Sequence, residues 1–341
     1  MELAILSAII VVVLALFFDF TNGFHDSANQ VATVIASRAL PPAAALIIAA
    51  MADFIGAYFF GTAVAETLGK GIIDPRMLNV GHLGILVVMS AICGAILWNL
   101  ITWYFGIPSS SSHALIGGLV GAFLIGWGFA PIHWLKVLEI VLIMIVSPLV
   151  GFSVAYFFAR IAWLFSQQFT PKVNNFFKKA QLFSLIAQGI SHGTNDAQKT
   201  MGVITFSLVI LGLYNPGQGS SMSIPSWVVI LCSLSLALGT ITGGWRIIKK
   251  LGAGLYRVRP IHSFVSQISS FAIIYITAIF GFPVSTTQVI SSSVMGAGAA
   301  TRAKMVRWQV AKDMAVAWLI TMPLSALLAG TFFYVLSKIF N

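Results

Sequence analysis

Gly23-Phe-His-Asp-Ser-Ala-Asn29 and Gly193-Thr-Asn-Asp-Ala-Gln-Lys199 are two related polar segments inside otherwise apolar sequence, and we call them the aspartate motifs. A second related pair, the hydroxyl motifs, is Phe105-Gly-Ile-Pro-Ser-Ser-Ser-Ser-His113 and Phe280-Gly-Phe-Pro-Val-Ser-Thr-Thr-Gln288. The two copies of each motif are separated by nearly the same number of residues, which indicates a tandem duplication. Both copies keep carboxylate, amide and hydroxyl groups where polarity is costly. The motifs therefore predict that a small polar solute is handled inside a membrane.

The composition is that of a membrane protein. Of the 341 residues, 58% are hydrophobic and only 8% are charged, whereas soluble domains average about 25% charged residues. A helix needs about 20 apolar residues to cross the hydrocarbon core, and most of the long apolar runs reach or approach that length. These runs are Leu3–Phe18, Ala43–Ala65, Leu83–Phe105, Val137–Phe165, Leu182–Leu213, Trp227–Trp245, Phe264–Phe280 and Val306–Leu336. They predict an all-α polytopic membrane protein embedded in a lipid bilayer.

The formal net charge of +10 does not require a nucleic-acid partner. Basic residues gather in the cytoplasmic loops of membrane proteins, and the loops of this chain hold most of its Lys and Arg residues. We therefore expect no binding of nucleic acid.

Corresponding loops of the two halves differ in charge. Residues 65–82 carry acidic and basic residues that cancel, whereas the matching residues 246–259 carry five basic residues and no acid. Because basic loops face the cytoplasm, the two halves are expected to lie in opposite orientations, as inverted repeats. We predict one repeat at 1–165, a cytoplasmic linker at 166–180 and a second repeat at 181–341. Each repeat then has an odd number of crossings, about five, and both termini lie outside.

The aspartate motifs place carboxylates in the membrane. Asp26 and Asp196 lie well inside long apolar stretches, and such a residue marks an ion or proton pathway by default. Gly, Ser, Thr and Asn around them favour helices less than Leu does. We therefore expect a broken helix in each repeat, with exposed backbone groups and polar side chains that bind a cation. The alternative is a helix-packing motif of small and polar residues.

Three further polar residues have two interpretations each. Lys199, whose counterpart in the first copy is Asn29, either neutralises Asp196 or supplies positive charge to an anionic solute. Asp19 and Asp53 lie in apolar runs, and they either join the ion pathway or pair with a neighbouring donor. The sequence leaves these alternatives open.

Each hydroxyl motif places a proline and several hydroxyl groups ahead of a Gly-rich apolar run. Proline fits the first turn of a helix, and Ser or Thr caps its free N–H groups. Such a helix N-terminus binds anions readily. The runs that follow, Ala114–Phe129 and Val289–Ala300, are short for a full span. We therefore predict a re-entrant hairpin in each repeat, with tips that meet near the midplane, rather than two ordinary turns at the membrane face.

Together, the four motifs resemble the inorganic phosphate transporter (Pit) family, in its compact bacterial type. The similarity rests on residues 23–35, 106–113, 192–199 and 281–288, and their order and spacing match through essentially the whole chain. The resemblance implies a secondary active transporter, not an enzyme, that carries inorganic phosphate together with Na⁺ or H⁺. Some bacterial members carry phosphate as a neutral complex with a divalent metal. A location in the inner (plasma) membrane, a homodimer and the absence of any cofactor other than these ions are also implied.

The resemblance also implies roles for individual residues. The coupling cation is expected at five residues of the aspartate motifs, which are His25, Asp26, Asn29, Asn195 and Asp196. Asp26 and Asp196 are the expected metal ligands if sodium or a metal–phosphate complex is bound. Phosphate is expected at the hydroxyl tips and at three residues that follow the second aspartate. These are Ser110, Ser111, Ser112, Ser285, Thr286, Thr287, Gln198, Lys199 and Thr200.

Two positions depart from the family pattern. Gln288 stands where bacterial members often have His, which argues against proton movement through the second hairpin. His25 stands where sodium-type members commonly have Asn, which favours proton or metal–phosphate coupling.

Three other functions fit the sequence less well. Sulfate, another tetrahedral oxyanion, is the main alternative substrate, although sulfate-carrying relatives depart from the aspartate motif. A channel needs a continuous polar pore, whereas polarity here is concentrated in a few short segments. An intramembrane enzyme with Ser112 as nucleophile and His113 as base is disfavoured, because adjacent helical residues do not face each other.

Overall fold

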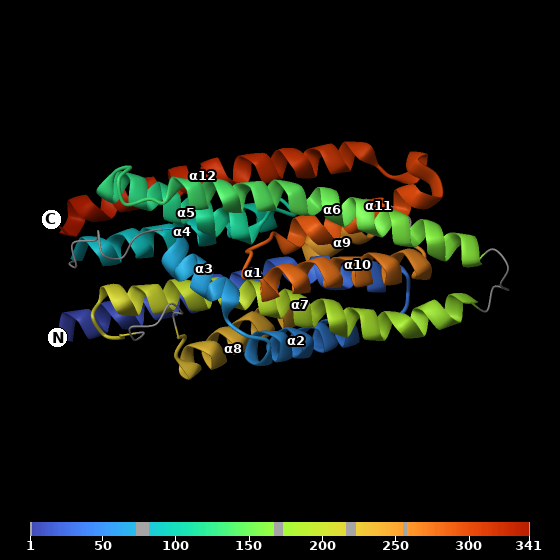
Figure 1. Ribbon diagram of the computed structural model, residues 1–341, viewed down its shortest axis with the longest axis horizontal. Helices are drawn as coiled ribbons and strands as arrows, with labels where there is room; N and C mark the ends of the chain where they lie inside the picture. The colour runs from blue at the N-terminus through green and yellow to red at the C-terminus, as the bar shows by residue number, and fades with distance from the viewer. Residues whose placement is uncertain (1, 73–81, 167–172, 216–222, 255–257, 341) are drawn as a thin grey trace.

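The computed structural model describes residues 2–72, 82–166, 173–215, 223–254 and 258–340, which form twelve α-helices and one short 3-10 helix (Figure 1). The α-helices are α1 (Glu2–Ala36), α2 (Pro42–Phe59), α3 (Ala63–Gly71), α4 (His82–Tyr104), α5 (Ser111–Trp127), α6 (Trp134–Ser166), α7 (Val173–Ile210), α8 (Ser226–Thr242), α9 (Trp245–Gly254), α10 (Pro260–Ile279), α11 (Thr286–Arg302) and α12 (Trp308–Phe340). Among the described residues, α1, α2, α4, α6, α10 and α12 are long and apolar enough to cross a bilayer. The prediction of an all-α polytopic membrane protein is confirmed.

The long helices run roughly along the longest axis of the molecule (Figure 1). Both chain termini lie at one end, which we call the terminal end. The end of α6 and the beginning of α7 lie at the opposite end, which we call the linker end. The predicted linker lies partly outside the described residues, and from Val173 onward it is the first part of α7.

The two halves of the chain pack against each other reciprocally. Helix α1 contacts α8 and α9, and α7 makes the equivalent contacts with α2 and α3. In the same way α5 contacts α12, and α11 contacts α6. Corresponding helices also match in length, because α5 and α11 have 17 residues each and α6 and α12 have 33 each. Each half therefore completes the core of the other.

Glycine makes these reciprocal contacts possible. A Cβ on Gly23 would lie 2.2 Å from the carbonyl oxygen of Leu236 in α8. A Cβ on Gly193 would lie 2.0 Å from the carbonyl oxygen of Asp53 in α2. The same two helix pairs have one further close approach each, Gly239 against Phe20 and Gly56 against Ile190. At these points only a residue without a side chain lets the backbones approach so closely.

The predicted helix break at the aspartate motifs is wrong, because α1 and α7 run through them without interruption. Side chains of neighbouring helices supply the polar partners of the motifs, so the backbone hydrogen bonds of α1 and α7 stay intact. The motif glycines instead lie at close helix contacts, as the helix-packing alternative predicts. Each half does contain a break elsewhere. Gly61 (φ 92°) separates α2 from α3, and Gly243 (φ 71°) separates α8 from α9, because glycine readily adopts positive φ.

Each hydroxyl motif forms the turn of a helical hairpin, between α4 and α5 in the first half and between α10 and α11 in the second. Ser110 and Ser285 cap α5 and α11, because their side chains accept hydrogen bonds from backbone N–H groups three residues further on. The two hairpin tips meet. The hydroxyl of Ser112 donates a hydrogen bond of 3.2 Å to the carbonyl oxygen of Val284.

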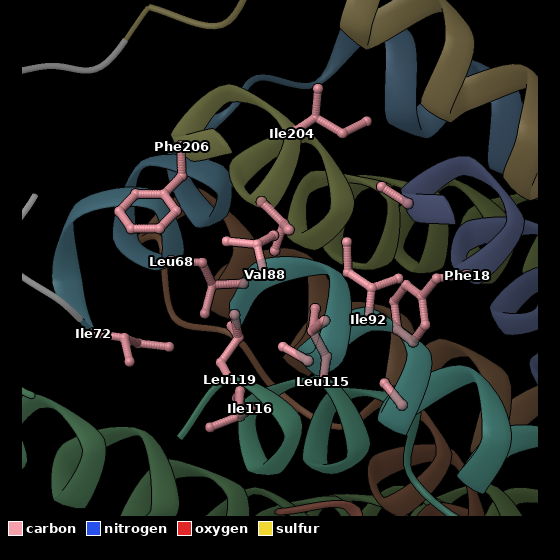
Figure 2. Close-up of a cluster of buried hydrophobic side chains, with 14 of the residues drawn as sticks. Phe18, Leu68, Ile72, Val88, Ile92, Leu115, Ile116, Leu119, Ile204 and Phe206 are labelled. Atoms are coloured by element: carbon pink, nitrogen blue, oxygen red, sulfur yellow. The ribbon is translucent and has the colours of Figure 1, made fainter. Parts of the chain in front are cut away.

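The core differs between the two ends of the molecule. Toward the terminal end, apolar side chains of α1, α3, α4, α5 and α7 pack together, among them Phe18, Ile92 and Leu115 (Figure 2). Toward the linker end there are further apolar clusters, one of them containing Val31, Leu46 and Ile247, but α7 and α10 also bury many amides and hydroxyls. These are Gln181, Ser184, Gln188 and Ser191 on α7, and Ser263, Ser266, Gln267 and Ser270 on α10. The aspartate motifs thus lie between an apolar part of the core and a part that mixes apolar and polar side chains.

We expect Gly193→Ala to destabilise the protein, because the added methyl group meets the backbone of α2 rather than a flexible side chain. Overpacking of this kind costs about 1–3 kcal/mol, so the variant in detergent should unfold at a lower temperature than the wild type. Gly330→Ala is the matched control, since its nearest neighbour is the side chain of Ile125 at 3.1 Å. Equal unfolding temperatures for the two variants would contradict the proposed importance of this contact.

Candidate ion and substrate site

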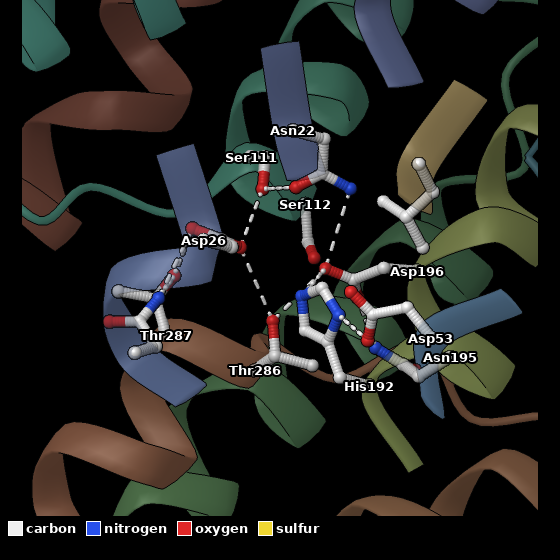
Figure 3. A network of polar contacts seen from close by, with 12 residues as sticks. Asn22, Asp26, Asp53, Ser111, Ser112, His192, Asn195, Asp196, Thr286 and Thr287 are labelled. Atoms are coloured by element: carbon white, nitrogen blue, oxygen red, sulfur yellow. Dashed lines mark hydrogen bonds and ion pairs between the residues drawn. The ribbon is translucent and has the colours of Figure 1, made fainter. Parts of the chain in front are cut away.

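The two motif aspartates come together at one site although they lie on different helices. Asp26 on α1 and Asp196 on α7 are both completely buried. The hydroxyl of Thr286, at the tip of the second hairpin, lies 3.4 Å from Oδ2 of Asp26 and 3.1 Å from Oδ2 of Asp196 (Figure 3). The Thr286 hydroxyl has a single proton, so it donates to one carboxylate at a time, but it lies close enough to reach both.

Asp26 is surrounded by donors from both hairpins and from its own helix. Oδ1 lies 3.0 Å from the hydroxyl of Thr287 and 3.2 Å from the amide nitrogen of Asn29, and both groups donate to it. The hydroxyl of Ser111 lies 3.1 Å from Oδ2 and also within hydrogen-bonding distance of the Asn22 amide oxygen, and it donates its one proton to either of them. His25 places Nδ1 2.9 Å from Oδ1. Asp26 therefore joins α1 to the tips of both hairpins.

Asp196 has the only buried Lys or Arg side chain of the described residues as its partner. The ammonium of Lys199 lies 2.5 Å from Oδ1 of Asp196, and it also donates to the Ser112 hydroxyl and the Val284 carbonyl. The amide of Asn195 donates to the same Oδ1 at 2.6 Å. Of the two roles that the sequence left open for Lys199, this geometry supports neutralisation of Asp196. The ammonium also reaches both hairpin tips.

The six predicted hydroxyl residues divide into two groups. Ser111, Ser112, Thr286 and Thr287 bond to the charged residues of the site (Figure 3). Ser110 and Ser285 cap their helices instead and, among the described residues, bond to neither aspartate. The capping residue of each tip therefore orients the helix, while the two residues that follow it reach into the site.

Two predicted phosphate ligands do not join this cluster. Gln198 bonds to the carbonyl of Gly61 at 2.6 Å and to the N–H of Val64 at 2.8 Å, so it fixes the break between α2 and α3. At about 100° per residue, a position two residues after Asp196 faces away from it. Thr200 donates to Oδ1 of Asp19 at 2.9 Å.

The site contains residues that the sequence did not assign to it, and both lie four residues before a motif aspartate. Asn22 accepts a hydrogen bond from Ser111 and lies 3.4 Å from Oδ2 of Asp196. His192 places Nε2 3.3 Å from Oδ2 of Asp196 and Nδ1 3.0 Å from Oδ1 of Asp53. Residues four apart share one face of a helix. That spacing was the signal available in the sequence.

Asp53 pairs with neighbouring donors and thereby connects α2 to the site. Besides His192, the amide of Gln30 donates to both of its oxygens at 2.9 and 3.1 Å, and the hydroxyl of Thr240 donates at 2.6 Å. A row of polar groups therefore runs from Asp53 through His192 to Asp196 and on to the hairpin tips (Figure 3).

The residues of the site fit a cation. Asp26, His192 and Asp196 each offer one ligand atom, and these atoms lie within 4.8 Å of one another. Carboxylate, hydroxyl and amide oxygens, which surround them here, are the ligands that hard cations prefer. The amide oxygen of Asn29 is buried and has no hydrogen-bond partner. This oxygen is therefore one more group that could act as a ligand of a cation.

Among the described residues, buried acidic side chains outnumber buried lysine and arginine side chains. Asp19, Asp26, Asp53 and Asp196 are buried, and Lys199 is the only buried lysine or arginine of the described residues. Taking charges out of water costs several kcal/mol per ion unless each is paired. The acidic groups therefore need further positive charge, either as metal cations or as protons on the carboxylates and on the adjacent imidazoles of His25 and His192.

A narrow cavity adjoins the site on the linker side of Asp26. It lies between α1, α9 and α11 and is lined by Asn29, Thr33 and Ser291, together with apolar side chains. Within the part of the chain that the structure describes, the Asn29 amide oxygen and the hydroxyls of Thr33 and Ser291 have no hydrogen-bond partner. Buried polar atoms normally have one, so the cavity offers unused hydrogen-bonding groups next to Asp26.

The fold and this site together define a class of protein. A bundle of membrane-spanning helices that buries opposed charges beside two helical hairpin tips is typical of secondary transporters.

Comparisons with known proteins identify the family. The chain belongs to the phosphate transporter family, whose profile matches residues 22–329. It is 41% identical to a probable low-affinity inorganic phosphate transporter of Bacillus subtilis, with all of both chains covered. A protein of the same description from Rhizobium meliloti is 44% identical over 95% of this chain and 94% of its own length. The family that the motifs predict is confirmed. The predictions of a multi-pass membrane protein and of a transporter rather than an enzyme are confirmed as well.

A solved structure shares the fold. The structure described as the sodium-dependent phosphate transporter superposes with a TM-score of 0.87, covering 98% of this chain and 99% of that one, at 24% sequence identity. The arrangement of helices described above is therefore that of a known transporter fold.

We expect Thr286→Val to weaken phosphate uptake strongly, because it removes the hydroxyl that bridges Asp26 and Asp196. Losing a hydrogen bond to a charged group costs about 1.5–3 kcal/mol, or roughly a tenfold to hundredfold loss in apparent affinity. The measurement is the initial rate of labelled phosphate uptake into proteoliposomes. Thr277→Val is the matched control, since that hydroxyl bonds only to carbonyls of its own helix α10. Equal affinities in the two variants would argue against Thr286 as a site residue.

Proposed function

We propose that this chain is a secondary active transporter that carries inorganic phosphate across a membrane together with cations. The observation that supports this most directly is the convergence of both aspartate motifs and both hydroxyl tips on one buried site that contains two carboxylates. A site of this kind accepts an anion only if cations accompany it.

Electrostatic repulsion between the site and phosphate makes coupling to a cation obligatory in this proposal. Phosphate near neutral pH carries one or two negative charges, and the site already contains Asp26 and Asp196. Like charges at close range in a low-dielectric interior repel each other strongly. A cation or proton between the carboxylates and the anion turns this repulsion into attraction. Neither ion then binds well without the other.

The residues of the site have distinct roles in this proposal. Asp26 and Asp196 hold the coupling cation, with the Asn29 and Asn195 side chains beside them. The four tip hydroxyls of Ser111, Ser112, Thr286 and Thr287 hold the phosphate oxygens. The hydroxyls of Ser111, Thr286 and Thr287 can redirect their hydrogens from a carboxylate to a phosphate oxygen once a cation neutralises the carboxylate. The hydroxyl of Ser112 can redirect its hydrogen from the Val284 carbonyl. The Lys199 ammonium, which contacts both tips, lies within reach of the same anion.

Alternating access follows from the repeat structure. We propose that residues 1–165 and 181–341 are inverted repeats whose hairpins are re-entrant, and the reciprocal contacts of α1 with α8 and of α7 with α2 support this. The apolar packing toward the terminal end closes one route to the site. The polar cavity at Asn29, Thr33 and Ser291 marks the opposite route. Movement of one hairpin against the other would open the route at the terminal end and close the route at the linker end.

The same proposal includes a topology. Many basic residues lie at or next to the linker end, namely Arg38, Arg160, Lys178, Lys179, Arg259, Arg302, Lys304 and Arg307. Basic segments stay in the cytoplasm, so the linker end faces inward and both termini face outward. Location in the inner (plasma) membrane and a homodimer belong to the proposal as well, and both rest on the family resemblance.

We expect Asp26→Asn and Asp196→Asn each to abolish phosphate uptake, because each variant removes a charge that the coupling cation needs. Uptake of labelled phosphate into proteoliposomes measures this. Asp313→Asn is the control, since Asp313 is exposed and bonds only to Gln309 on its own helix. If both site variants transport at the wild-type rate, the assignment of the aspartates is incorrect.

The coupling ion can be determined with imposed gradients. Phosphate uptake should rise when a gradient of the coupling ion is imposed, and it should saturate with phosphate concentration. Separate Na⁺ and pH gradients, each with and without Mg²⁺, distinguish sodium, proton and metal–phosphate coupling. Excess sulfate should leave uptake unchanged, and strong inhibition by sulfate would point to a general oxyanion permease instead.

A further inference from the structure

Asp19 is a buried carboxylate outside the site described above, and it is poorly provided with partners. Its side chain is completely buried. Oδ1 accepts one hydrogen bond, from Thr200 at 2.9 Å, and Oδ2 accepts none. By contrast, Asp53 is equally buried but receives donors on both oxygens. Asp53 therefore pairs with neighbouring donors, whereas Asp19 is the one of the two that fits a role in an ion pathway.

The basic groups nearest to Asp19 are already paired with other aspartates, since His192 contacts Asp53 and Asp196 and Lys199 contacts Asp196. On α1 it follows Phe18, which belongs to the apolar packing of the terminal end. The titratable groups that act on it are Asp196, His192 and Lys199 on α7, and the thiol of Cys232 on α8. Lys199 already pairs with Asp196 at 2.5 Å. An ionised Asp19 would thus be an unpaired buried charge, and such groups take up a proton instead.

Asp19 is nevertheless connected to the site. Asn22 and Asp26 lie three and seven residues further along α1, so all three side chains share one face of the helix. Its hydrogen-bond donor, Thr200, is adjacent to Lys199 and one helical turn from Asp196. A change of charge at Asp19 therefore acts on the same segment of α7 that holds the coupling site.

We propose that Asp19 is a dedicated proton-binding residue of the transport cycle, separate from the cation site at Asp26 and Asp196. This inference rests on the proposed function. A proton from water on the terminal side forms an O–H bond at the carboxylate when the apolar packing there opens. The same proton returns to water on the linker side after phosphate has left. One proton crosses the membrane in each cycle, in the same direction as phosphate, and any cation at Asp26 and Asp196 is additional.

The first experiment compares the number of protons taken up per phosphate in proteoliposomes, using a trapped pH indicator and labelled phosphate. We expect Asp19→Asn to lower this ratio by about one proton, because the amide has the shape of the carboxyl group but does not titrate near neutral pH. Thr200→Val removes the hydrogen bond and leaves Asp19 able to bind a proton, so it should keep the wild-type ratio. Asp313→Asn is the control for loss of an exposed acid. A wild-type ratio in Asp19→Asn would overturn the proposal.

A second measurement covers the case in which Asp19→Asn shows no net uptake. Exchange of external labelled phosphate for internal unlabelled phosphate needs no net proton movement, so this variant should retain exchange. Loss of both exchange and uptake in a variant with wild-type thermal stability would show that Asp19 belongs to the substrate site, against the proposal.

A third measurement does not depend on transport. The infrared spectrum of the wild-type protein near neutral pH should contain the carbonyl band of a buried protonated carboxyl group, and Asp19→Asn should lack it. If the two spectra are the same in this region, Asp19 is ionised and the proposal fails. If the wild-type protein does not transport phosphate, the proposed function fails, but the infrared spectrum still shows whether Asp19 is protonated.

Discussion

The excess of buried acidic side chains over buried lysine and arginine side chains is the constraint on which the rest of this structure depends. Four aspartates and one lysine are buried among the described residues. In a low-dielectric interior each of these charges must be paired, hydrogen-bonded or neutralised by a proton. Asp196 is paired with Lys199, Asp53 is bound by His192, Gln30 and Thr240, and Asp26 receives hydroxyl donors from both hairpins. The network thus holds together helices that are far apart in sequence.

The same constraint connects structure to transport. Hydroxyl groups that bond to carboxylates in the described arrangement are also suitable donors for the oxygens of an anion. Thr286 lies within hydrogen-bonding distance of both motif aspartates, so in the proposed function a cation bound at these carboxylates would release its hydroxyl for the anion. Coupling between the two solutes would then need no long-range signal, since the cation frees the same few hydroxyls that the anion binds.

Glycine at helix contacts is what brings these groups together. Gly23 and Gly193 let α1 and α7 approach α8 and α2 until a Cβ would clash with a backbone carbonyl. This close approach places Asp53 beside His192, which lies one residue before Gly193. The glycines of the aspartate motifs therefore serve helix packing, whereas the neighbouring polar residues form the site. Both groups of residues favour helices less than Leu does, and for this reason the sequence predicts a helix break, whereas α1 and α7 are continuous.

The sequence by itself determined the class of protein, the duplication and the four segments that form the site, because hydropathy and motif chemistry are properties of short stretches of chain. It also determined the hairpin turns and their caps, which depend on local geometry at Pro108, Ser110, Pro283 and Ser285. Only the tertiary structure decided which side chains share one site. Gln198 turns toward the break after α2, Thr200 turns toward Asp19, and Asn22 and His192 join Asp196. Such choices depend on which helices become neighbours and how closely they approach, and that is settled by contacts between residues more than a hundred positions apart.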